Sequence, residues 1–499
     1  MKSKLFLVLF GLVACFVSRL LFVNSNVFFF DGDEAIVALM GLDALDGHFP
    51  LYFSGQNYGL STLEALLVSF GVLIFGTSML AVKVLMLALW SSAVSLLTLT
   101  FFKLSRQNKL ATALFILVLI TSPTWLVWSM KARGGYLSSF FFSSLILFLL
   151  VEYKEKLNLV IWAVIGVSLT LVYETHPIWL PCLLPIIGFF LWKQEGSLMK
   201  KLPSLGGFVT GGGISALAFY YVKSTIEVVY KAPQPNFAKR LTLIDQIPEV
   251  LLKTLGGNYF LSTSYQPSNQ SYATIFLVAF LAITAIGIVY MVRQKRLGLS
   301  AILLLSTLFS FSGFLVKSEP RYLLPFFGFA LLTIVSVYGE MENDKLKKGI
   351  LGMSILLCLM GLSTMPNFNK YSFVNMSLTE VDQHVKNDEA VMEKLILKFK
   401  SEGVKYVFTT NEFLQYQLNY MSNNELLVVG RKDRCRIPSN VEDIMSAYAE
   451  NANEFAIIGY NFRYGYTGKI PLVGNKIFYI IRPNKVTLEQ VGFFKEIES

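Results

Sequence analysis

Long uninterrupted apolar runs constrain this chain more than any other feature of its sequence. As helices, runs of this length span or nearly span the hydrocarbon of a bilayer, and their continuity differs from the alternating pattern of barrel strands. The composition agrees, because 54% of the residues are hydrophobic and 15% are charged, which would leave large apolar patches on a soluble protein. We therefore expect an all-α polytopic membrane domain with about eleven transmembrane helices, at residues 5–27, 79–102, a run ending near 128, 136–151, 157–172, 178–192, 205–222, 272–292, 299–316, 322–338 and 349–365.

Basic residues cluster after every second run, and this pattern predicts the orientation of the chain. With Lys2 and Lys4 in the cytoplasm, the clusters fall on the cytoplasmic side, as the positive-inside rule requires. We expect a multi-pass protein of the cytoplasmic (inner) membrane with a cytoplasmic N-terminus, whose first run is an uncleaved span rather than a signal peptide. The net charge of +10 fits these clusters and does not indicate nucleic-acid binding. The clusters are Lys103, Arg106 and Lys109; Lys154 and Lys156; Lys193, Lys200 and Lys201; Arg293, Lys295 and Arg296; Lys345, Lys347 and Lys348.

The composition changes near residue 367, where charged and polar residues become frequent. A helical pattern at 388–401 and strand patterns at 405–410, 425–430, 455–460 and 476–482 predict a soluble α/β fold there. We therefore divide the chain into a transmembrane domain, residues 1–366, and an extracytoplasmic α/β domain, residues 367–499. The apolar segment 60–76 is short and contains Glu64, so we expect a helix along the outer interface rather than a span.

The segment after the first run, FFFDGDEAIVALMGLDALDGHFP, places acidic residues beside the membrane. Asp31 or Asp33 could cap a helix over residues 35–46, which accounts for one acid but not for the whole group. Carboxylates beside hydrocarbon carry a desolvation cost and tend to be functional, so Asp33, Glu34 and Asp31 are candidates for a site. They could take a proton from a nucleophile, orient an acceptor, bind a metal or relay protons.

Basic residues occur on the same predicted side, where the positive-inside rule does not favour them. Lys131 and Arg133 precede Gly134-Gly135 in SPTWLVWSMKARGGYLSS, and Arg321 lies in KSEPRYLLP. Arginine binds phosphate oxygens in a bidentate manner, lysine adds a point charge, and glycines let backbone N–H groups approach an anion. Each residue alone could be a snorkelling side chain. Together with the acidic segment, they indicate an anionic lipid headgroup beside a general base.

The sequence resembles the GT-C membrane glycosyltransferases, and within them the protein mannosyltransferase and aminoarabinose transferase-like branch, glycosyltransferase family 39. The resemblance rests on Asp33-Glu34 after the first run, on Gly55-Gln56-Asn57-Tyr58, on KARGGY before the fourth run and on EPRYLLPFFGFALL. It implies an enzyme that moves a single sugar, usually with inversion, from a polyprenyl-phosphate donor to an acceptor on the outer side of the cytoplasmic membrane. The acceptor would be a lipid, a wall polymer or a protein, and the sugar is left open.

The resemblance also implies roles for individual residues. Asp33 would be the catalytic base, with Glu34 positioning it or the acceptor. Lys131, Arg133 and Arg321 would bind the donor phosphate, the leaving group, whose negative charge grows in the transition state. No cofactor or metal site is indicated, and a divalent metal stays an open alternative. Further candidates for supporting or acceptor contacts are Asp31, Glu64, Glu174, His176 and Tyr58.

Two departures from the family pattern concern the acceptor side. Residues 61–64, Ser-Thr-Leu-Glu, stand where relatives often have Lys-Pro or Pro-Pro, and residues 122–133 lack the second acid that many relatives carry. Glu174 could supply that acid. For His176, a polar cap ahead of Pro177 is the preferred explanation.

Two other classes of function stay open at this level. A transporter of polyprenyl lipids or other solutes would show paired halves with broken helices at the membrane midplane. A non-catalytic sensor would use the C-terminal tail as its working part. The gathering of ionisable residues at the predicted outer edge favours the enzyme.

Overall fold

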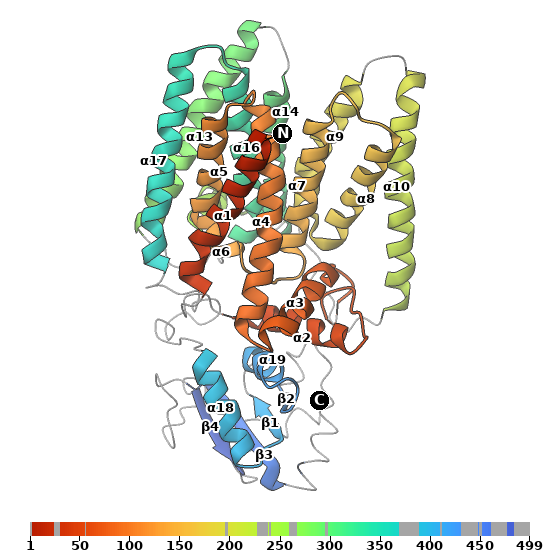
Figure 1. Ribbon diagram of the computed structural model, residues 1–499, viewed down its shortest axis with the longest axis vertical. Coiled ribbons are helices and arrows are strands. Elements are labelled where there is room, and N and C mark those ends of the chain that lie inside the picture. Colours follow the sequence, from red (N-terminus) through yellow and green to blue (C-terminus); the bar gives the residue numbers. More distant parts are fainter. Residues whose placement is uncertain are drawn as a thin grey trace.

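The computed structural model shows a bundle of long helices with a smaller sheet-containing region at one end (Figure 1). It describes residues 2–23, 30–54, 56–194, 198–226, 238, 241–258, 267–294, 298–368, 389–409, 412–430, 448, 452–460 and 477–483. Among these residues, seven helices are long and apolar enough to cross a membrane. The predicted polytopic helical fold is therefore confirmed.

Each apolar run expected from the sequence coincides with a helix or a pair of helices. The run ending near 128 is divided, because Ser122 begins a second helix by accepting a hydrogen bond from the Trp125 N–H (3.3 Å), with Pro123 at its first position. Several of these helices are shorter than the seven spanning candidates. The elements of the bundle are α1 (Lys2–Val23), α4 (Met79–Leu104), α5 (Lys109–Thr121), α6 (Pro123–Trp128), α7 (Tyr136–Glu152), α8 (Leu159–Thr175), η1 (Pro177–Trp179), α9 (Leu180–Lys193), α10 (Leu198–Thr225), η2 (Ile244–Gln246), α12 (Ile247–Leu255), α13 (Pro267–Gln294), α14 (Leu299–Phe309), α15 (Ser312–Val316), η3 (Pro320–Leu323), α16 (Leu324–Glu340) and α17 (Asp344–Phe368).

Two further helices, α2 (Gly32–Leu45) and α3 (Thr62–Phe75), lie across one end of the bundle (Figure 1). They pack closely because Gly41 has no side chain, and a Cβ there would come within 3.1 Å of the Ala65 carbonyl oxygen. Helix α3 is not one of the seven spanning candidates, and it keeps an apolar face exposed, as expected for an interfacial helix. The exposed apolar side chains of α3 are Leu66, Phe70, Leu73, Ile74 and Phe75.

The C-terminal region contains a four-stranded sheet in the order β2-β1-β3-β4. Strand β1 pairs in parallel with β2 and β3, and β3 pairs antiparallel with β4. These strands and α18 coincide with the predicted patterns, which confirms an α/β fold in this region. Helix α19 (Glu412–Met421) is absent from the sequence-based expectations, and it packs against α2 (Figure 1). The other elements are α18 (Glu389–Ser401), β1 (Tyr406–Thr409), β2 (Leu427–Val429), η7 (Ala452–Glu454), β3 (Phe455–Tyr460) and β4 (Ile477–Ile481).

Candidate functional site

The N-terminus of α2 is capped by the acidic segment itself. Asp31 is the N-cap residue, and its carboxylate accepts a hydrogen bond from the Glu34 N–H (3.0 Å). The Glu34 carboxylate in turn accepts one from the Asp31 N–H (3.2 Å), which completes a capping box. Capping is therefore the local role of Asp31, and the box fixes Asp33 on the first turn of α2.

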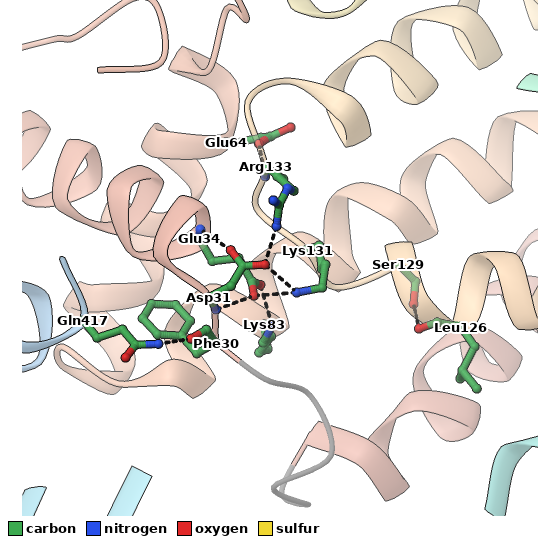
Figure 2. Close-up of polar contacts among 10 residues, drawn as sticks. All are labelled: Phe30, Asp31, Glu34, Glu64, Lys83, Leu126, Ser129, Lys131, Arg133 and Gln417. Atoms are coloured by element: carbon green, nitrogen blue, oxygen red, sulfur yellow. Dashed lines mark hydrogen bonds and ion pairs between the residues drawn. The ribbon is translucent and has the colours of Figure 1, made fainter. Parts of the chain in front are cut away.

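Two cations from the basic turn after α6 surround these carboxylates (Figure 2). Lys131 lies between the two acids of the capping box, with its Nζ 3.0 Å from Asp31 Oδ2 and 2.9 Å from Glu34 Oε2. Arg133 pairs with Asp31 through Nη1, and its Nη2 lies 2.6 Å from Asp33 Oδ2. The acidic segment and the basic turn, about one hundred residues apart in the chain, therefore converge on one cluster.

A third cation, Lys83 of α4, joins this cluster and is absent from the sequence-based candidates. Its Nζ pairs with Glu34, and its side chain is 3% exposed. The sequence carried a usable signal, since Lys83 is a lone charge in the apolar run MLAVKVLML, and charges inside spans are usually functional. Three cations now face the carboxylates of Asp31, Asp33 and Glu34, so the charges balance. Among the residues that the structure describes, no three His, Cys, Asp or Glu side chains are placed to hold a metal ion.

Burial differs among the three carboxylates of the cluster. The side chains of Asp31 and Glu34 are 1% and 0% exposed, whereas that of Asp33 is 18% exposed. Burial alone would raise the pKa of Asp31, but Arg133 and Lys131 beside it and the Glu34 N–H hold this pKa well below its usual range. Burial likewise disfavours the charged form of Lys131, yet Asp31 and Glu34 raise its pKa above the ordinary value. The inner charges thus neutralise one another, and Asp33 is the most accessible of the three acids.

Glu64, in the first turn of α3, connects this helix to the basic turn and to the start of α7. Its carboxylate accepts hydrogen bonds from the N–H groups of Arg133 (3.1 Å) and Ser138 (3.3 Å) and from the Ser138 hydroxyl (3.2 Å). Figure 2 shows it beside the Arg133 backbone. Burial raises the pKa of Glu64 to about 7, although these donors oppose the shift. Glu64 therefore acts on the position of Arg133 through the backbone of the turn.

We expect Glu64 to make the protein less stable as the pH rises. The pKa of Glu64 is raised from 4.5 to about 7 on folding. Between these values the folded state keeps a proton that the unfolded state has lost, so the stabilisation from this proton decreases as the pH rises and is gone above about pH 7. The free energy of unfolding should fall by up to about 3 kcal/mol across this window. Glu64→Gln, which cannot ionise, should flatten the change in melting temperature between about pH 5 and pH 8. Equal pH dependence in both proteins would show that Glu64 does not titrate there.

Gly135, at the end of the basic turn, has a left-handed backbone, with φ of +89°. A Cβ there would lie 2.8 Å from the Thr175 carbonyl oxygen and 3.0 Å from the Leu60 carbonyl oxygen. Gly135→Ala should therefore cost more than the roughly 1–2 kcal/mol of left-handed strain alone. Gly47→Ala is the matched control, because Gly47 has φ of +85° and nothing within 4 Å of a Cβ. Equal losses in melting temperature for the two variants would contradict a tightly packed turn.

Glu174 lies in a second group of charged and aromatic side chains at the end of α8. Its carboxylate accepts a hydrogen bond from the Tyr52 hydroxyl (2.9 Å) and lies 2.6 Å from Lys223 Nζ. Lys223 also lies over the rings of Tyr52 and Tyr173, at 5.3 and 5.5 Å from their centroids. The Glu174 carbonyl accepts a hydrogen bond from the Leu60 N–H (2.8 Å). These contacts join α8 and α10 to the segment between α2 and α3.

Arg321 and His176 meet in a third, aromatic group. Arg321, in η3, lies 5.6 Å from the centroid of the Tyr322 ring, and this ring lies 5.9 Å from the His176 ring. His176 also packs against Tyr136, at 3.9 Å between centroids. It occupies the cap position before η1, but its side chain makes no capping hydrogen bond there. Burial, with Arg321 nearby, lowers the pKa of His176 to about 3, so its imidazole is neutral. Tyr58 is 40% exposed.

The same arrangement of helices occurs in solved structures, which confirms the resemblance at the level of the fold. Two crystal structures of ArnT from Cupriavidus metallidurans share it. The apo structure aligns with a TM-score of 0.60 at 11% sequence identity, over 97% of this chain and 99% of that chain. The structure bound to undecaprenyl phosphate aligns with a TM-score of 0.57 at 12% identity, over 97% and 98%. No family model and no curated protein matches the sequence.

Proposed function

We propose that this protein is a membrane glycosyltransferase that moves a single sugar from a polyprenyl-phosphate donor to an acceptor on the outer side of the cytoplasmic membrane. The observation that carries the proposal is the pairing of Asp33, a partly exposed carboxylate, with Arg133, at 2.6 Å. A carboxylate able to accept a proton and a guanidinium able to bind phosphate are thereby adjacent. The ArnT structure that holds undecaprenyl phosphate supports a lipid donor of this kind.

The proposed reaction needs one base and one anion-binding group. The oxygen of an acceptor hydroxyl attacks the anomeric carbon while the bond from this carbon to the phosphate oxygen breaks, and the electron pair leaves with the phosphate. Asp33 takes the hydroxyl proton. Arg133 stabilises the charge that grows on the phosphate, which is a good leaving group, so no general acid is required. Attack from the opposite face gives inversion.

The buried members of the cluster have a supporting role in this proposal. Lys131, which the resemblance implied at the donor phosphate, is 0% exposed and lies between Asp31 and Glu34. In this proposal it neutralises these two acids. Arg133 is 9% exposed and spans from Asp31 to the more exposed Asp33. A donor phosphate would compete with Asp33 for Nη2 of Arg133. Donor binding would then release the carboxylate to act as a base.

The other candidate residues extend the proposed site. Arg321 would contact the phosphate from η3, supported by the aromatic group around His176. Glu174 and Tyr58 would lie toward the acceptor. The segment between α2 and α3 contains Tyr58, and its Leu60 contacts both the Glu174 carbonyl and Gly135 of the basic turn. By the positive-inside pattern, this end of the bundle, with the C-terminal domain, would lie outside the cytoplasm.

The proposal is tested by identifying the bound lipid and assaying transfer. Mass spectrometry of the purified protein should find a polyprenyl phosphate or its sugar derivative. The protein should then move that sugar to acceptors from the same membranes, releasing polyprenyl phosphate. Movement of intact lipid between leaflets without loss of its sugar would instead identify a transporter and overturn the proposal.

A further inference from the structure

Helix α19 of the C-terminal region contacts the residue that precedes the acidic cluster. The Gln417 side-chain amide donates a hydrogen bond to the Phe30 carbonyl, and both side chains are fully buried. Figure 2 shows Gln417 reaching Phe30, directly beside Asp31. On the next turn of α19, the Tyr420 ring packs against the Phe30 ring, at 5.7 Å between centroids.

A second contact from α19 reaches the helix that carries Lys83. The Tyr420 hydroxyl donates a hydrogen bond to the Ser78 carbonyl (3.0 Å). Ser78 is the N-cap residue of α4, where its hydroxyl accepts a hydrogen bond from the Ala81 N–H (3.2 Å). One short helix therefore contacts the starts of both α2 and α4, and these two helices carry four members of the ion cluster: Asp31, Asp33, Glu34 and Lys83.

The peptide unit between Phe30 and Asp31 is held on both sides. Its carbonyl accepts the Gln417 hydrogen bond, and its N–H donates to the Glu34 carboxylate (3.2 Å). The orientation of the Gln417 amide follows from chemistry, because a peptide carbonyl can only accept. Rotation of this peptide unit would move the capping box and, with it, the first turn of α2 that carries Asp33. Buried hydrogen bonds of this kind fix orientation strongly, because breaking them leaves unpaired groups away from water.

We propose that Gln417 and Tyr420 are positioning residues, through which the C-terminal domain holds Asp33 and Lys83 in the geometry for transfer. This inference rests on the proposed function. It assigns the C-terminal domain a part in catalysis without contact to the donor. An error of about 1 Å in placing a reacting group can cost about 100-fold in rate, so such remote contacts are kinetically visible.

Gln417→Met tests the inference, because it keeps the size of the side chain and removes the donor. We expect kcat for sugar transfer to fall about 10- to 100-fold, with the KM for the donor within about twofold of the wild type, since Arg133 is unchanged. Asn419→Leu is the matched control on the same helix. Asn419 exchanges two hydrogen bonds with the Val428 backbone (2.9 and 3.0 Å), inside the C-terminal domain. It should leave kcat unchanged. An equal fall in kcat for both variants, or none for Gln417→Met, would overturn the inference.

Amide hydrogen exchange separates this inference from the proposed function. In full-length Gln417→Met, exchange at residues 31–36 should be at least about tenfold faster than in the wild type, because the start of α2 opens more often. Tyr420→Phe should produce the same change at the start of α4. Unchanged exchange in both variants would refute positioning by α19. If the wild type transfers no sugar, the proposed function fails, and the exchange result alone then decides whether α19 positions the cluster.

Discussion

Asp33→Asn is expected to lower the rate of sugar transfer by about 10²- to 10⁴-fold without weakening the binding of polyprenyl phosphate. The amide is nearly the same size as the carboxylate, so the cap of α2 at Asp31 and the packing of the first turn persist. What is lost is the group that, in the proposed reaction, would accept the proton of the attacking hydroxyl. The measurement is single-turnover transfer of labelled sugar, with lipid binding measured on the same preparation.

Asp46→Asn serves as the control for this first prediction. Asp46 is an exposed acid at the C-terminal end of the same helix, so its substitution removes an equal charge far along α2 from the cluster. It should transfer sugar at the wild-type rate. Activity of Asp33→Asn within about threefold of the wild type would exclude Asp33 as the base, because removal of a general base has a larger effect.

Lys131→Met is expected to lower the free energy of unfolding by about 3–5 kcal/mol, the largest stability effect in the site. Lys131 is fully buried between Asp31 and Glu34, and its loss leaves these acids with too little positive charge. A buried carboxylate without its partner must either take up a proton or draw water into the protein. Thermal unfolding of the protein in detergent would measure the loss.

Two further variants sharpen the second prediction. Adding Glu34→Gln to Lys131→Met removes one surplus negative charge, so the double variant should be more stable than the sum of the single losses predicts. Lys154→Met is the control, because Lys154 is 51% exposed and lies 3.7 Å from Glu155. It should change stability by less than about 1 kcal/mol. A melting temperature of Lys131→Met equal to that of the wild type would contradict a buried charge network.

The helices of this fold were predictable because each apolar run carries its own signal. A spanning helix satisfies its backbone internally, so length and hydrophobicity decide its existence without reference to neighbours. The strands β3 and β4 were predictable for a similar local reason, since FAIIGY and IFYII are short apolar segments rich in β-branched and aromatic residues. The paired acidic and basic segments were predictable as one site, because opposite charges at one edge of a membrane protein attract.

The parts that could not be predicted depend on tertiary contacts. Helix α19, with the sequence EFLQYQLNYM, mixes polar and aromatic residues, and its partners lie on α2 and α4. Arg321, expected to bind the donor phosphate, lies 5.6 Å from the centroid of the Tyr322 ring, and the sequence did not indicate this aromatic neighbour. No pattern in a single sequence states which neighbours a buried polar side chain will meet.

We propose that Asp33 and the donor phosphate share Arg133. The most direct test is to measure undecaprenyl phosphate affinity and sugar transfer together for Asp33→Asn and Arg133→Met. Asp33→Asn should bind the lipid roughly 2- to 5-fold more tightly, because a competing ion pair is removed, and it should lose transfer, whereas Arg133→Met should lose both. Weaker lipid binding by Asp33→Asn, or transfer that survives in Arg133→Met, would contradict the account.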